Sequence, residues 1–210
     1  MMKLNTAKCN YMIFTRSQDF ATRLTIDENK IERVNVSKLL GIWISEDLSW
    51  AKNCQEICKK AFSRLSMITK LKYVGVSIED LLDIYILFIR SVTEYCSVVF
   101  HSSLTQEQSD KIEKIQKTSL KIILGDSYIS YSAALEMCNL KTLYERRENR
   151  CLDFALKSTK HKRLFPLKTS TSDYEVREKE KFHVNFARTS KYQKSAIPYC
   201  QRKLNEYFSK

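Results

Sequence analysis

Glu79 and Asp80 are the closest approach in this sequence to the paired carboxylates that a two-metal polymerase or nuclease needs. The usual sign of such a site is an Asp-Asp pair on a tight hairpin, and the sequence contains no Asp-Asp pair. Both residues follow Ser77 at the spacing of a helix start, where the helix dipole and capping favour acidic side chains. We therefore interpret them as capping residues and predict no catalytic residues.

Cys54 and Cys58 are spaced so that, on a helix, both thiols could face one metal ion. Nothing completes a ligand set, because His101, His161 and His183 are far apart and match no zinc-finger or knuckle spacing. Packing as small hydrophobic side chains is the favoured explanation for the two thiols. The sequence also lacks a glycine-rich phosphate loop and a Gly-x-Ser-x-Gly motif. We predict no metal site, no cofactor and no self-contained active site.

Arginines supply the first candidates for binding. Arg146, Arg147 and Arg150 fall on one broad face of a predicted helix. Guanidinium groups bind phosphate oxygens in bidentate fashion, so this face is a candidate for phosphate contact. Pairing within the helix to Glu145 and Glu148 is the competing explanation, and we favour it slightly.

A second set of basic residues alternates with aromatic residues near the C-terminus. Aromatic rings can stack on bases while the cations hold the backbone. The same residues can instead form a small apolar patch that anchors the tail on the helical body. The aromatic members are Phe182, Phe186, Tyr192 and Tyr199, and the basic candidates for nucleic-acid binding are Lys181, Arg188, Lys191, Lys194 and Arg202.

The charge is unevenly distributed along the chain. Residues 157–210 contain 14 Lys and Arg against 5 Asp and Glu, a net charge of +9 out of the total of +12. Such an excess indicates a polyanionic partner or, alternatively, only a solvated surface. Seven irregularly spaced cysteines do not form a disulfide framework, and no secretory signal or apolar run of about 18 residues is present. We expect an intracellular protein, cytoplasmic or nuclear, that does not enter a membrane.

The chain contains only 3 Gly and 2 Pro, which disfavours an all-β fold and favours long helices. Strand-like patterns occupy residues 11–14, 24–34 and 39–44, and the second of these predicts a hairpin around a turn at 27–29. Gly41 inside the third pattern predicts a bulge or a close backbone approach.

The periodicity becomes helical after Ser49. Apolar residues recur at steps of three or four from Ile57 to Leu71. Capping boxes begin at Ser77, Thr105 and Thr142, a shorter helix is expected over 131–137, and Gly125 is placed to end a helix. After about Ser158 the periodicity fades, and 160–163 and 168–172 predict a basic, loop-rich extension.

Several blocks, taken in order, resemble the C-terminal half of reverse transcriptases from jockey-like and LINE-like non-LTR retrotransposons. Residues 4–14 resemble the palm segment that follows the catalytic Asp-Asp hairpin in that family. Residues 39–50 are similar to the hairpin that grips the primer and to the tryptophan that opens the thumb. Residues 89–96, 120–125 and 143–147 resemble the helical region beyond the thumb, and 165–166 and 195–198 resemble the tail.

The resemblance implies an α+β, predominantly α-helical fold. A small N-terminal antiparallel sheet or hairpin would be a palm remnant (1–48), followed by a thumb-like helical bundle (49–158) and a basic tail (159–210). Lys8 matches the palm lysine near the incoming nucleotide's phosphates. Leu40 and Gly41 match the primer-grip hairpin, where glycine lets the backbone approach the primer.

The same resemblance implies that the catalytic Asp-Asp motif would precede Met1. We therefore expect no enzymatic activity from this chain alone, although the complete family enzyme needs Mg²⁺. The expected function is that of a truncated RNA-directed DNA polymerase that still binds RNA or an RNA–DNA duplex without sequence preference.

The alternative function is a helical protein-interaction module, or a decayed gene product, with no nucleic-acid role. Its partner would be the missing upstream polymerase part or a second copy. Self-association would then bury Tyr11, Ile13, Phe14 and Ile42 of an uncovered sheet.

Overall fold

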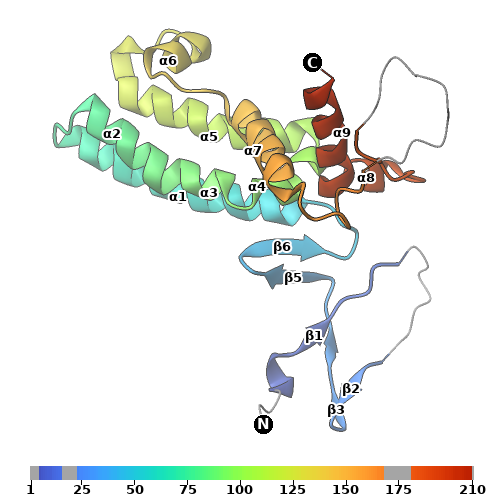
Figure 1. Cartoon of the computed structure of the whole chain (residues 1–210). Coiled ribbons are helices and arrows are strands. Elements are labelled where there is room, and N and C mark those ends of the chain that lie inside the picture. The colour runs from blue at the N-terminus through green and yellow to red at the C-terminus, as the bar shows by residue number, and fades with distance from the viewer. Residues whose placement is uncertain (1–4, 16–22, 168–180, 210) are drawn as a thin grey trace. The chain divides into compact units, whose positions relative to one another are not determined.

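The computed structural model describes residues 5–15, 23–167 and 181–209. The chain divides into two compact units, Met1–Gln55 and Glu56–Lys210, and each is described by itself. The predicted class is confirmed, because short strand pairs occur only in the first fifth of the described chain and helices dominate the rest (Figure 1).

The N-terminal unit contains the predicted hairpin between residues 24 and 34. Strands β2 (Thr25–Ile26) and β3 (Asn29–Lys30) pair antiparallel. The two residues between them, Asp27 and Glu28, have φ values of 48° and 64°. Positive φ at both central positions is the signature of a type I′ turn, whose twist matches that of the flanking strands.

A second hairpin joins β5 (Val36–Leu39) to β6 (Ile42–Ser45), with Leu39 opposite Ile42. Its turn consists of Leu40 and Gly41, with φ values of 47° and 88°. The sequence predicts a bulge or a close backbone approach at Gly41 within a continuous strand, and the structure has a two-residue turn there instead of a bulge. Glycine is needed here because the second turn position has a left-handed backbone that strains other residues.

The remaining strands are two residues long. After the 3₁₀ turn η1 (Thr6–Lys8), strand β1 (Asn10–Tyr11) pairs in parallel with β4 (Glu32–Arg33). Within residues 5–15 and 23–55, three separate strand pairs thus replace the single small antiparallel sheet that the sequence predicts. Strands this short leave few ladder hydrogen bonds with which to join the pairs into one sheet.

Helices make up the second unit, and their starts follow the predicted capping residues. Ser77 accepts a hydrogen bond from the backbone N–H of Asp80, and complete capping boxes form at Thr105 and Thr142. The elements are α1 (Ala51–Tyr73), which begins in the N-terminal unit, α2 (Ile78–Ile84), the π-helical segment η2 (Tyr85–Arg90), α3 (Ser91–Glu94), α4 (Ser97–Phe100), η3 (His101–Ser103), α5 (Gln106–Leu124), η4 (Gly125–Ser127), α6 (Tyr131–Met137), α7 (Leu143–Ser158), α8 (Ser190–Gln193) and α9 (Ala196–Phe208).

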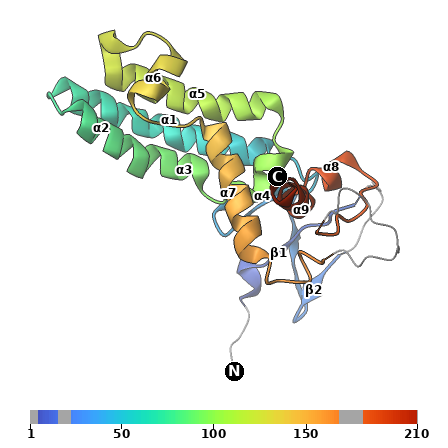
Figure 2. The same cartoon turned by 45° about the horizontal axis from the view of Figure 1, so that its top comes forward.

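Helices α1, α2 and α5 lie side by side, with α6 at one end of the group (Figure 1 and Figure 2). Their apolar faces form one core, which includes Ala61, Ile68, Leu81, Ile115 and Ile123, each almost fully buried. The helical period predicted for α1 is confirmed by this burial. Gly125 ends α5 with a φ of 56°, as the sequence predicts, and α6 covers the predicted residues.

The C-terminal segment follows its prediction at residues 160–163, which form turns, but differs from it further along. Instead of ending as a loop-rich extension, it forms α9, whose Cys200 and Leu204 are fully buried against Cys151 and Ala155 of α7. Phe165 and Phe182 complete this second core. The segment therefore belongs to the helical unit rather than to a separate tail, while the predicted loop at 168–172 lies outside the described residues. No helix in the described part of the chain is long and apolar enough to cross a bilayer.

Candidate nucleic-acid interface

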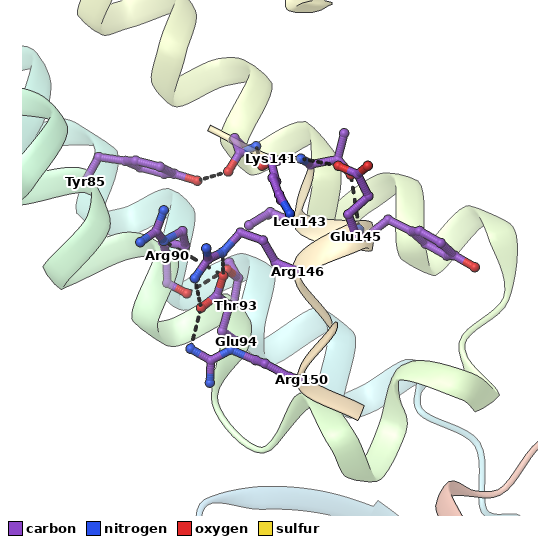
Figure 3. A network of polar contacts seen from close by, with 12 residues as sticks. Tyr85, Arg90, Thr93, Glu94, Lys141, Leu143, Glu145, Arg146 and Arg150 are labelled. Atoms are coloured by element: carbon purple, nitrogen blue, oxygen red, sulfur yellow. Dashed lines mark hydrogen bonds and ion pairs between the residues drawn. The ribbon is translucent and has the colours of Figure 1, made fainter. Parts of the chain in front are cut away.

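Three arginines surround one carboxylate where α7 crosses η2 and α3 (Figure 3). Arg146 donates from Nε to Glu94 Oε1 and from Nη2 to Glu94 Oε2 at 3.1 Å. Arg150 donates from Nη2 to Glu94 Oε2 at 2.7 Å. Arg90, one helical turn before Glu94, places its Nε 3.8 Å from Oε1. We call these four residues the arginine cluster.

The electrostatics of the arginine cluster follow from its burial. Only 4% of the Glu94 side chain is exposed. Burial alone would raise the pKa of Glu94, but the hydrogen bond and charge of Arg146, with Arg150 and Arg90, hold it below the ordinary value. Burial, and then the charge of Arg146, lowers the pKa of Arg90. One carboxylate thus faces three cations, which leaves the cluster with an excess of two positive charges.

Two of the arginines reach solvent. The side chain of Arg90 is 13% exposed, whereas those of Arg146 and Arg150 are 28% and 49% exposed. The pair on α7 therefore forms the accessible side of the arginine cluster, and Arg90 its inner side. An arrangement of this kind can bind an anion that approaches α7 from solvent.

Glu113 of α5 holds the first turn of α7 in place. Its Oε1 accepts a hydrogen bond from the backbone N–H of Leu143 at 3.0 Å, and its Oε2 accepts one from Tyr144 at 3.1 Å. The hydroxyl of Tyr131 also donates to Oε1. These bonds satisfy backbone donors at the helix N-terminus and fix the turn that carries Arg146.

A buried glutamine ties the same turn to the helical core. Gln116 accepts from the hydroxyl of Tyr85 at 2.6 Å and donates to the backbone oxygen of Lys141 at 3.0 Å. Tyr85 opens the π-helical segment that ends at Arg90, so this bond links both sides of the arginine cluster (Figure 3). A π-helical segment has more residues per turn than an α-helix, and such segments occur often at functional sites.

Arg147 does not share the accessible face with its neighbours, which corrects the sequence prediction. It is fully buried, donates from Nη2 to Ser109 Oγ at 2.9 Å, and directs Nε toward His101 Nδ1 at 3.5 Å. Residues 147 and 151 face the core because they follow Leu143 at helical spacing. Arg147 is therefore a core residue.

The two acidic residues that the sequence favours as intrahelical partners of the arginines make other contacts in the structure. Glu145 instead closes the capping box with Thr142. Glu148 pairs with Lys203 of α9 at 2.9 Å. The two accessible arginines, Arg146 and Arg150, form ion pairs with Glu94. No sequence pattern on α7 could indicate this partner.

The basic candidates near the C-terminus are spread over α8, α9 and the segment before them. Lys181 lies over the ring of Phe208, with Nζ 4.3 Å from its centre, and Arg202 donates to the backbone oxygen of Gln193. Lys181, Arg188, Lys191 and Lys194 are exposed, and Arg202 is half-buried.

The aromatic residues among them differ in burial. Phe182 is buried, and Tyr199 packs against the core of α7 and α9 to which Phe182 belongs, as the anchoring explanation requires. Phe186 and Tyr192 are instead exposed, Phe186 to 85%, and are the rings accessible to a base. The anchoring explanation thus holds for Phe182 and Tyr199, whereas base stacking by Phe186 and Tyr192 stays a prediction.

The residues matched to the palm and primer grip lie in the N-terminal unit. Lys8 is exposed at the end of η1. Leu40 and Gly41 form the tip of the β5–β6 hairpin, where Leu40 is 83% exposed. The match of this hairpin tip to a primer grip, and of Lys8 to the palm lysine, stays a prediction.

No three His, Cys, Asp or Glu side chains gather closely enough to hold a metal ion within residues 5–15, 23–167 and 181–209. Cys54 is buried, and Cys58 packs against the core of α1, α2 and α5. Their burial agrees with packing as small hydrophobic side chains.

The chain matches no family model, no curated protein and no solved structure. Its function must therefore be inferred from its own residues and their arrangement.

Sequence reasoning missed Arg90 and Glu94 as members of the site. A signal was present, because they stand four positions apart in the otherwise uncharged stretch from Ile84 to Cys96. Charged residues on the buried face of a helix need partners, and the excess arginines on α7 are suitable ones. The sequence could not show that α3 and α7 meet.

Proposed function

We propose that this chain is part of a reverse transcriptase of non-LTR retrotransposon type and that it binds nucleic acid without sequence preference. The ordered blocks of resemblance support this origin. The observation that carries the binding function is the charge of the C-terminal segment. Its described residues, 157–167 and 181–209, include ten Lys and Arg but one acidic residue, Glu206.

Eight of these ten basic residues are exposed, namely Lys157, Lys160, Lys162, Arg163, Lys181, Arg188, Lys191 and Lys194. Together with the excess charge of the arginine cluster, they offer phosphates many contacts and release counterions on binding. The exposed rings of Phe186 and Tyr192 add surfaces for stacking. Binding of this kind depends on the phosphate backbone rather than on base edges.

The proposal includes an intracellular location, in the cytoplasm or nucleus, and no synthesis of DNA by this chain alone. The catalytic carboxylates of the family, and with them the Mg²⁺ site, correspond to sequence upstream of the matched blocks.

The test is fluorescence anisotropy with a labelled RNA–DNA hybrid over a salt series from 50 to 300 mM. Affinity is expected to fall as the salt concentration rises. A plot of log Kd against log salt concentration should be a rising straight line whose slope is set by the number of phosphates contacted. Scrambling the hybrid's sequence should leave the affinity unchanged. Absence of binding by folded protein at 50 mM salt would contradict the proposal.

A second candidate function, protein interaction, is favoured by exposed apolar side chains on the helical unit. Leu87, Phe88 and Tyr95 are each more than half exposed on η2 and α3 or directly after them. In the N-terminal unit Phe14 is exposed, but Ile42 is buried, so the sheet is less uncovered than the sequence predicts. Sedimentation that shows dimers unaffected by added RNA would support this function over nucleic-acid binding.

A further inference from the structure

The arginine cluster has more positive charge than its own carboxylate can balance. Glu94 contributes one negative charge against the three guanidinium groups of Arg90, Arg146 and Arg150. Because the group is partly removed from water, this imbalance is less screened than it would be on an open surface. A bound anion would reduce the repulsion among the three guanidinium groups.

The two arginines on α7 still have donors to offer. Contacts with Glu94 use Nε and Nη2 of Arg146 but only Nη2 of Arg150. A guanidinium group has five N–H donors, so each side chain keeps further N–H groups beyond those given to Glu94. Both side chains also reach solvent, with Arg150 half exposed.

Glu94 fixes the direction of these side chains. A free arginine loses considerable rotamer freedom when it binds a phosphate, and this loss reduces affinity. Here both guanidiniums are already held by one buried carboxylate, which sits on an element tied through Tyr85 and Gln116 to the turn that begins α7. Much of the entropy that the two side chains would lose on binding a phosphate is therefore already lost when the protein folds.

The face of α7 that carries both arginines continues toward the C-terminal basic segment. Positions 146, 150 and 157 fall within an arc of about 40° on a helix of 3.6 residues per turn. Lys157 is exposed and leads to Lys160 in the basic segment, while Asp153 is the acidic residue on this face. Three cations, Arg146, Arg150 and Lys157, outnumber Asp153 on this face, which suits a chain of phosphates better than a single small anion.

We propose that Arg146 and Arg150, positioned by Glu94, form a clamp for one phosphate group of a nucleic-acid backbone. The clamp rests on the proposed nucleic-acid binding and names where the strongest phosphate contact lies. Arg146 and Arg150 donate to the phosphate oxygens, and Glu94 acts as a positioning residue that does not touch the ligand.

The test compares Arg150→Ala, Arg150→Lys and a control, Lys114→Ala, in the anisotropy assay with the RNA–DNA hybrid. Lys114 is exposed on α5, outside the arginine cluster, so its removal changes total charge equally. Arg150→Ala is expected to weaken binding about tenfold at 50 mM salt and to reduce the salt slope by about one. Arg150→Lys keeps the charge but loses the fork, and is expected to weaken binding at least about threefold. Lys114→Ala is expected to change the affinity less than about twofold.

Glu94→Gln separates positioning from charge. The substitution makes the protein more positive, so charge alone predicts tighter binding, whereas the clamp predicts weaker binding because its arginines lose their common anchor. Circular dichroism checks that the variant is folded, and the Arg150 variants decide the question if it is not.

The outcomes distinguish the two proposals. If the unmodified protein does not bind the hybrid, the proposed function fails. If it binds but Arg150→Ala equals Lys114→Ala, or Arg150→Lys equals the unmodified protein, the clamp is overturned while nucleic-acid binding stands.

Discussion

Arg146 and Glu94 are 52 positions apart in the chain, yet they form a two-point ion pair between α7 and α3. Burial of the carboxylate makes this pair a structural element as well as part of a binding site. Because Arg90 and Arg150 share the same carboxylate, removing Glu94 would leave three cations facing one another. The folded state should therefore depend on Glu94 more than on any exposed acidic residue.

Replacing Glu94 with alanine should lower the free energy of unfolding by about 3 kcal/mol, because a buried ion pair loses one partner and leaves uncompensated charge. Urea denaturation followed by circular dichroism measures this change. Glu107→Ala is the matched control, since Glu107 pairs with Lys111 on the exposed face of α5. The control should leave the denaturation midpoint unchanged, and equal effects of the two substitutions would contradict the role assigned to Glu94.

His101 should stay neutral down to an unusually low pH. Its burial, and then the nearby charge of Arg147, lowers its pKa from an ordinary value of 6.5 to about 4. Below pH 6.5 the unfolded chain binds a proton that the folded protein excludes, so stability from this group is complete above pH 6.5 and is lost as pH falls toward 4. A proton NMR titration of the histidine resonances checks the folded-state pKa.

The stability consequence is checked by urea unfolding at pH 7 and pH 4.5. The unmodified protein should lose more stability over this range than His101→Gln, whose side chain keeps an acceptor for Arg147 but cannot be protonated. A parallel loss in both proteins would show that other groups control the acid sensitivity.

Gly125 should tolerate alanine poorly. Its φ of +56° strains residues with a Cβ, and an added Cβ would lie 2.5 Å from Nζ of Lys72. That amine donates to the backbone oxygen of Ile122 at 2.6 Å and so helps to end α5. We expect Gly125→Ala to lower the free energy of unfolding by about 2 kcal/mol, from strain and the displaced lysine together.

Gly75→Ala is the control for backbone strain alone, because Gly75 has a φ of +85° and open space around its Cβ position. Gly75→Ala should lower the free energy of unfolding less than Gly125→Ala does in the same denaturation experiment. A double variant with Lys72→Ala should be less destabilised than the sum of the single changes, since both remove the same hydrogen bond. Strict additivity would contradict this explanation.

Leu204→Ala tests whether α9 belongs to the core. Leu204 is fully buried with Cys151, Ala155 and Phe165, so the substitution should lower the free energy of unfolding by about 3 kcal/mol. Tyr207→Ala, three positions further along α9 and half exposed, should cost less than about 1 kcal/mol. Similar small effects in both variants would mean that the C-terminal segment is only loosely attached.

The sequence determined the local structure of the helical unit. Capping residues at Thr105 and Thr142, and the glycine at 125, act on their own helix ends, so the signal and its effect lie within a few residues. The predominance of helix followed from the shortage of Gly and Pro, and the hairpin at 24–34 from its local alternation. Gly41 was misplaced because the same residue type suits a bulge and a type I′ turn, and only strand pairing distinguishes them.

The tertiary structure alone decided what the arginines of α7 do. Their spacing shows that Arg146, Arg147 and Arg150 share a broad arc of the helix surface. It does not show which part of that arc faces the core and which part faces solvent. Packing on α5 buries Arg147, and the approach of α3 brings Glu94 to the other two. Likewise α9 is a short helix whose apolar side chains gain stability only when α7 covers them. Contacts between residues about 50 positions apart depend on how helices pack, and local sequence patterns do not encode that.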